Sequence, residues 1–72
     1  MLDYQKRMIE EYKQLKERAE KLGVLLGKAA IDELDFELSC PIELLQAQWH
    51  AMGAYLKILE ERAKFEGIDL YA

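Results

Sequence analysis

The fold is decided by residues 41–65, PIELLQAQWHAMGAYLKILEERAKF, because this stretch carries apolar residues at helical spacing on two faces. One series runs in steps of three and four: Ile42, Leu45, Trp49, Met52, Leu56, Leu59 and Ala63. A second series lies on the other side and is interrupted only by Glu61: Leu44, Ala47, Ala51, Ala54, Ile58 and Phe65. One neighbouring helix covers one such face, so the stretch predicts a helix that is contacted from two sides.

A partner helix is predicted over residues 3–29, which are rich in Glu, Lys, Leu and Ala and contain no proline. Its single apolar seam has heptad spacing: Met8, Tyr12, Leu15, Ala19, Leu22, Leu26 and Ala29. The opposite face is charged. We therefore expect an all-α fold, an antiparallel two-helix hairpin of coiled-coil type, with Tyr12 and Trp49 in its core. In this register Leu22 lies near Trp49 and Leu15 near Leu56.

The remaining segments form one domain with the helices, residues 1–72. Residues 30–40 are predicted to be a loop whose apolar side chains, Leu34, Phe36 and Leu38, fold over the open end of the hairpin. Ser39 or Cys40 is expected near the cap of the helix over 41–65, with Pro41 in its first turn. Gly67 predicts the end of that helix. The tail, residues 66–72, is expected to dock on the hairpin or on a neighbouring molecule.

A chain of 72 residues buries a small core and usually needs a further source of stability. Cys40 is the only cysteine, so no disulfide forms within one chain, and with His50 it falls short of the ligand set of a structural zinc site. Oligomerisation is the remaining source of stability. We therefore expect a homo-oligomeric helical bundle whose chains are joined through the second series. The alternatives are that the first helix or the tail covers this series.

Charge and composition argue against several classes of function. The formal charge of -4 argues against binding to a nucleic-acid polymer. No apolar run approaches the ~20 residues of a membrane span, and the first residues resemble no signal peptide, so we expect a cytoplasmic protein that does not bind membranes. His50 is the only histidine, which leaves little material for catalysis. We expect a protein that is not an enzyme and has no metal or cofactor.

Binding of a small anionic ligand has more support in the sequence. Aromatic rings stack on planar groups and guanidinium groups bind phosphate, which makes five residues candidates: Tyr4, Arg7, Arg18, Tyr55 and Arg62. The competing interpretation of Arg18, Tyr55 and Arg62, which flank the seam, is that they are intersubunit residues or members of surface ion pairs. Gly53 lies inside a predicted helix, where glycine is costly. Close helix packing is the expected reason, and approach of a ligand is the alternative.

Several segments resemble a family of small phage proteins described as crAss-phage-related. They include residues 4–12, YQKRMIEEY, residues 40–45, CPIELL, residues 58–63, ILEERA, and the ending at residues 66–70, EGIDL. More coarsely, the hairpin is similar to that of phage anti-CBASS and anti-Thoeris proteins, homo-oligomers that sequester nucleotide immune signals. These resemblances imply a phage protein, acting in the cytoplasm of the infected bacterial host, that binds a cyclic nucleotide or an ADP-ribose derivative. The alternative is a module that binds and inhibits a host protein through an apolar helix face.

Overall fold

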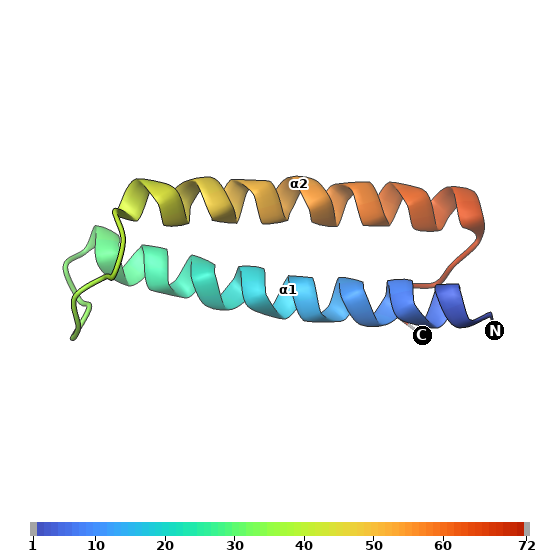
Figure 1. Cartoon of the computed structure of the whole chain (residues 1–72), viewed down its shortest axis with the longest axis horizontal. Helices are drawn as coiled ribbons and strands as arrows, with labels where there is room; N and C mark the ends of the chain where they lie inside the picture. The colour runs from blue at the N-terminus through green and yellow to red at the C-terminus, as the bar shows by residue number, and fades with distance from the viewer. Residues whose placement is uncertain (1, 72) are drawn as a thin grey trace.

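The computed structural model describes residues 2–71, and these form two long helices that run antiparallel side by side (Figure 1). Helix α1 is Asp3–Ala30 and helix α2 is Ile42–Glu66, and the molecule measures 45 × 18 × 17 Å. The all-α hairpin is confirmed, whereas its assembly into a bundle stays a prediction. The two ends of the predicted domain, Met1 and Ala72, lie outside the described residues. Neither α1 nor α2 is apolar over enough of its length to span a bilayer.

Short-range hydrogen bonds pair backbone groups at both ends of α1. At the start, the backbone N–H of Leu2 donates to Oε1 of Gln5 over 3.0 Å. At the other end, Asp32 adopts a left-handed conformation with φ 57°, which Asp tolerates better than most residues. This turn brings the N–H of Glu33 within 2.8 Å of the Lys28 carbonyl oxygen, one of the acceptors that the helix end leaves free.

The ends of α2 are set by its proline and by a glycine. Pro41 itself is the residue before the helix, with φ -58° and ψ 141°, and no side chain caps the first turn. The prediction placed Ser39 or Cys40 near the cap and Pro41 in the first turn; Pro41 is instead the cap itself and Cys40 directly precedes it. The fixed φ of proline suits the residue that leads into a helix. The predicted stop at Gly67 is confirmed: its φ is 67°, and the following N–H of Ile68 donates to the Ala63 carbonyl over 2.9 Å.

The tightly packed core lies at the end of the hairpin where the chain starts and finishes. It consists of Met8, Ile9, Tyr12, Leu59, Ala63 and Leu70, with Leu15, Leu56 and Ile68 packed against it. Tyr12 and Leu59 are the most completely buried of these, at 2% and 0% exposure. Leu70 belongs to the tail, so the tail docks on its own hairpin. The core therefore joins three segments: both helices and the last residues of the chain.

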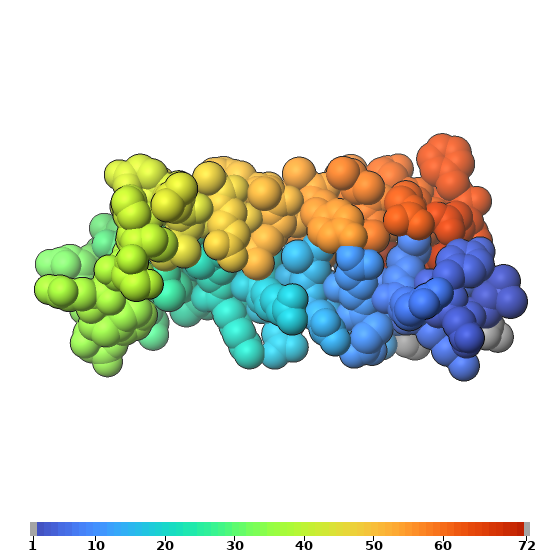
Figure 2. Space-filling view, in the orientation of Figure 1, coloured from blue at the N-terminus to red at the C-terminus, as the bar shows by residue number. Residues whose placement is uncertain are grey.

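The other end of the hairpin is covered by the connecting segment, residues 31–41 (Figure 2). Leu34 and Leu38 are half-buried and, with Leu26 and Ile42, line a small pocket of about 420 Å³. The prediction that the loop folds its apolar residues over this end is confirmed for those two. Phe36 lines the same pocket but is 55% exposed.

Between these two ends the packing is looser. Within the described chain, no residue from Glu20 to Ile58 is buried. The predicted burial of Trp49 is wrong: its side chain is 41% exposed, because it sits at the margin of the interface between the helices. The predicted seam residues Leu22, Leu45 and Met52 are half-buried. The middle of the hairpin therefore has an open side.

Candidate functional site

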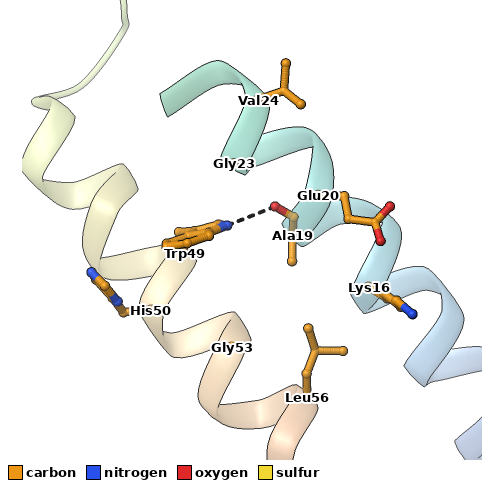
Figure 3. Close-up of a pocket in the computed structure, with 9 residues that line it drawn as sticks. All are labelled: Lys16, Ala19, Glu20, Gly23, Val24, Trp49, His50, Gly53 and Leu56. Atoms are coloured by element: carbon orange, nitrogen blue, oxygen red, sulfur yellow. Dashed lines mark hydrogen bonds between the residues drawn. The ribbon is translucent and has the colours of Figure 1, made fainter. Parts of the chain in front are cut away.

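The open side of the hairpin is a groove between α1 and α2 of about 870 Å³ (Figure 3). Helix α1 contributes Lys16, Ala19, Glu20, Gly23 and Val24, and helix α2 contributes Trp49, His50, Gly53 and Leu56. The volume is within the range of sites that bind small molecules. We refer to these nine residues as the Trp49 groove.

The indole of Trp49 is held in place by a single hydrogen bond. Its Nε1–H donates to the carbonyl oxygen of Ala19 over 3.0 Å, so the ring reaches across from α2 to α1 (Figure 3). The ring of His50 lies edge-on to it, with centroids 5.5 Å apart and an interplanar angle of 64°. Because the only polar atom of the indole is satisfied within the hairpin, the exposed part of the ring offers an apolar π surface rather than a hydrogen-bond donor.

The two glycines of the groove have different roles. A Cβ at Gly23 would lie 3.1 Å from Nε1 of Trp49, so the missing side chain is what lets the indole approach α1. A Cβ at Gly53 would meet nothing within 4 Å. Close packing of the two helices is therefore the wrong explanation for Gly53, and the wall of the groove at this residue is bare backbone.

Polar and charged side chains stand at the edges of the groove. Lys16 and Glu20 project from α1, whereas His50 projects from the side of α2 away from α1 (Figure 3). Lys16 also reaches toward the tail, where its Nζ lies 5.1 Å from the centroid of the Tyr71 ring. The long side chain of Lys16 therefore places a cation between the groove and the tail, within reach of an anionic group bound at this end of the groove. Among residues 2–71 no cluster of His, Cys, Asp or Glu is arranged to hold a metal ion.

The tail lines a second, smaller hollow next to the groove. Tyr12, Leu70 and Tyr71 line a smaller hollow of about 220 Å³ that shares Lys16 and Glu20 with the Trp49 groove. The hydroxyl of Tyr12 donates to Oε2 of Glu60 over 2.7 Å. Burial raises the pKa of Tyr12 well above its usual value, and the hydrogen bonds to Tyr71 and Glu60 raise it further. The tail is thus anchored by a neutral phenol that holds its proton.

None of the five binding residues predicted from the sequence lines the Trp49 groove. The hydroxyl of Tyr55 donates to the carboxylate of Glu11 across the two helices, and this hydrogen bond raises the pKa of Tyr55. The Nε–H of Arg62 donates to Glu66 over 3.2 Å within α2. Tyr4, Arg7 and Arg18 are exposed on α1. Their assignment to a ligand stays a prediction.

The groove was missed because each of its residues has an ordinary explanation in the sequence. Trp49 falls on the apolar seam of residues 41–65, and Gly23 lies near the end of the first predicted helix. One signal was available: in the antiparallel register a glycine on one helix faces the only tryptophan on the other. A second glycine then follows that tryptophan by one helical turn, at Gly53.

The second apolar series of α2 is exposed along its whole length. Leu44, Ile58 and Phe65 are 61%, 54% and 90% exposed, and the alanines between them are exposed as well: Ala47, Ala51 and Ala54. Neither α1 nor the tail covers this face, so both of the alternatives to an interface are wrong. We refer to these six residues as the outer stripe.

Comparison with known proteins gives a match to a protein family. The model of the Sequestin family matches residues 2–65, which span α1, the connecting segment and nearly all of α2. No curated protein and no solved structure matches the chain. The name of the family indicates a sequestering binder and so a protein that acts by binding rather than by catalysis.

Proposed function

Because the chain belongs to the Sequestin family, we propose that it is a phage-encoded, non-enzymatic binder that sequesters a small nucleotide immune signal. The signal is of the cyclic oligonucleotide or cyclic ADP-ribose type, and its capture inhibits host anti-phage defence in the cytoplasm of the infected bacterium. The mechanism is stoichiometric: each bound molecule is withdrawn from its receptor and is not turned over. The observation that carries the proposal is the Trp49 groove.

The chemistry of the groove favours a planar ligand that carries negative charge. Stacking of a base on an aromatic side chain is worth about 1–3 kcal/mol and needs an exposed ring, which Trp49 provides. Lys16 stands beside the groove and supplies a cation for a phosphate. Glu20 on the same wall disfavours a ligand whose charge is spread evenly, so we place the anionic group at the Lys16 end.

Self-association through the outer stripe is part of the same proposal. A contiguous exposed apolar face on a small domain is typical of an interaction surface. The alanines at its centre let a second α2 approach closely, and the larger residues at its ends, Leu44 and Phe65, extend the contact. In such an assembly Tyr4, Arg7, Arg18, Tyr55 and Arg62 remain candidates for ligand contacts supplied between protomers.

Binding is measured by calorimetry and by thermal melting with cyclic di-AMP, cyclic GMP-AMP, ADP-ribose and cyclic ADP-ribose. A ligand present at a hundred times its Kd stabilises the folded state by about 2.7 kcal/mol, which is a readily measured shift. Trp49 is the only tryptophan, so its fluorescence reports occupancy of the groove directly. We expect at least one of these nucleotides to bind, and Trp49→Ala to lose binding.

Phe36→Ala is the control, since Phe36 is an exposed aromatic residue outside the groove. Trp49→Phe is a second variant that keeps a ring and should retain part of the affinity if Trp49→Ala does not fold. If no nucleotide produces heat or a change in melting temperature, the proposed function is wrong.

The competing function is a module that binds and inhibits a host protein, and the exposure of the outer stripe is the observation that favours it. Affinity purification from host lysate separates the two. A stable host partner that is lost on Ala51→Glu, with no small molecule released on heating, would support the competitor.

A further inference from the structure

We propose that Gly53 determines which ligands the Trp49 groove accepts: it leaves the α2 backbone bare so that a planar, purine-like ring can lie against it beside the indole. The inference rests on the proposed function and specifies which part of the nucleotide lies against the α2 backbone at Gly53. The base occupies the space at Gly53, and the phosphate lies toward Lys16.

Nothing in the fold requires glycine at position 53. The residue lies in the interior of α2 (Ile42–Glu66), where glycine lowers helix stability because it gives up more backbone freedom on folding. Of the described glycines, only Gly67 has a positive φ. A Cβ at Gly53 would contact nothing within 4 Å, whereas one at Gly23 would stand 3.1 Å from Nε1 of Trp49, which is tighter than ordinary contact. Gly23 and Gly67 thus have structural reasons that Gly53 and Gly27 lack, and of these two only Gly53 lines the groove.

The position of Gly53 supplies a functional reason. It lies one turn beyond Trp49 on the same wall of the groove, opposite α1, and Leu56 continues that wall (Figure 3). Any side chain at position 53 would occupy groove volume that a ligand ring needs. Bare helix backbone next to an exposed indole gives a flat, apolar surface, and this shape suits a base better than a sugar or a phosphate.

Packing of a second copy through the outer stripe does not account for Gly53. The stripe runs through Ala51 and Ala54, on the side of α2 opposite the apolar seam. Gly53 lies between that seam and His50, on the wall that faces the groove. An interface and a ring site therefore use different faces of α2, and one protomer can present both at once.

The test compares Gly53→Ala and Gly53→Leu with Gly27→Ala and Gly27→Leu. Gly27 is a matched control because it is also helical, a Cβ there would also meet nothing within 4 Å, and it does not line the groove. Each variant is titrated with the four nucleotides named above and with ribose 5-phosphate, which lacks a base. Melting temperatures are recorded without ligand.

We expect Gly53→Ala to melt higher than the wild type by about 4–8 °C, since alanine is the better helix former. The same variant should bind the nucleotides at least tenfold more weakly, and Gly53→Leu should show no binding. Both Gly27 variants should bind like the wild type, and ribose 5-phosphate should bind no form of the protein tightly.

The possible failures are distinguishable. If the wild type binds a nucleotide and Gly53→Leu binds it equally well, the ring does not lie at Gly53 and this inference is wrong while the proposed function stands. If Gly53→Ala melts lower than the wild type, the glycine serves the fold and the inference is also wrong. If the wild type binds none of the four nucleotides, the proposed function and this inference are wrong together.

Discussion

Tyr12 of α1 and Tyr71 of the tail meet hydroxyl to hydroxyl at 3.0 Å, with ring centroids 5.9 Å apart and planes inclined at 86°. The hydroxyl of Tyr12 donates its hydrogen bond to Glu60 of α2. The hydroxyl of Tyr71 is therefore the donor in its hydrogen bond with Tyr12. One phenol oxygen thereby links all three segments that form the core. The contact fixes these three segments to one another at the end of the hairpin that holds the core.

The Tyr12 contact predicts a specific dependence of stability on pH. Because the pKa of Tyr12 is raised in the folded protein, the folded state keeps a proton that the unfolded chain releases near pH 10. Its stabilisation is complete below about pH 10 and is lost progressively as the pH rises further. Urea unfolding between pH 7 and pH 11 should therefore show a fall in the free energy of unfolding above about pH 10.

Tyr12→Phe is the variant that isolates this effect. At pH 7 it should be less stable by about 1–2 kcal/mol, because it leaves Glu60 and Tyr71 without their partner. The difference between wild type and variant should shrink above about pH 10. A difference that stays constant up to pH 11 would show that Tyr12 does not carry the alkaline dependence. Tyr4→Phe, at an exposed position on α1, is the control.

Leu70→Ala tests whether the tail is part of the core. Leu70 is 5% exposed and packs with Tyr12, Leu59 and Ala63, so its truncation should lower the free energy of unfolding by about 2–3 kcal/mol. Leu2→Ala is the matched control, since Leu2 is 61% exposed and should change stability by less than about 0.5 kcal/mol. Equal effects of the two changes, measured by urea unfolding, would mean that the tail is not docked in solution.

Gly23→Ala tests whether the indole of Trp49 is held against α1. The new methyl group would stand 3.1 Å from Nε1 of Trp49 and would push the ring away from the Ala19 carbonyl. We expect the fluorescence of the single tryptophan to shift to longer wavelength as the indole becomes more hydrated. Gly27→Ala should leave the emission unchanged. An unshifted spectrum for Gly23→Ala would mean that the indole is not held against α1.

Ala51→Glu and Ala54→Glu test the outer stripe. A carboxylate at the centre of a close helix contact is buried without a partner, so either change should dissociate an assembly formed through this face. Light scattering should give a lower mass than for the wild type. Gln46→Glu adds the same charge outside the stripe and should keep the assembled mass. An unchanged mass for both alanine variants would exclude the stripe as the interface.

The sequence was sufficient for the hairpin because its two seams repeat at heptad spacing over long stretches. It also predicted the end of α2 at Gly67, where the backbone takes a left-handed conformation that glycine adopts easily. It did not predict the burial of Ile9, which lies beside the seam and belongs to a core that also includes Leu70 of the tail. Periodicity assigns a face to each residue but says nothing of which distant segment covers that face.

The groove lay beyond such reasoning for a related reason. Helical spacing places Trp49 on the seam, but the size of the indole and the space left by Gly23 decide that it stays at the margin of the interface. Likewise, periodicity cannot separate a glycine needed for packing from one that faces empty space. The distinction between Gly23 and Gly53 requires the neighbouring atoms, and these come from the other helix.

The placement of the core at one end of the hairpin has a consequence for how such a chain can vary. The helices are aligned by Tyr12, Leu59 and the tail, whereas residues 31–41 join them at the opposite end. Insertions and deletions in that connection should be tolerated during evolution, because they leave the core contacts in register. A shift of even one residue in α1 or α2, or the loss of Leu70, would move every contact of the core at once.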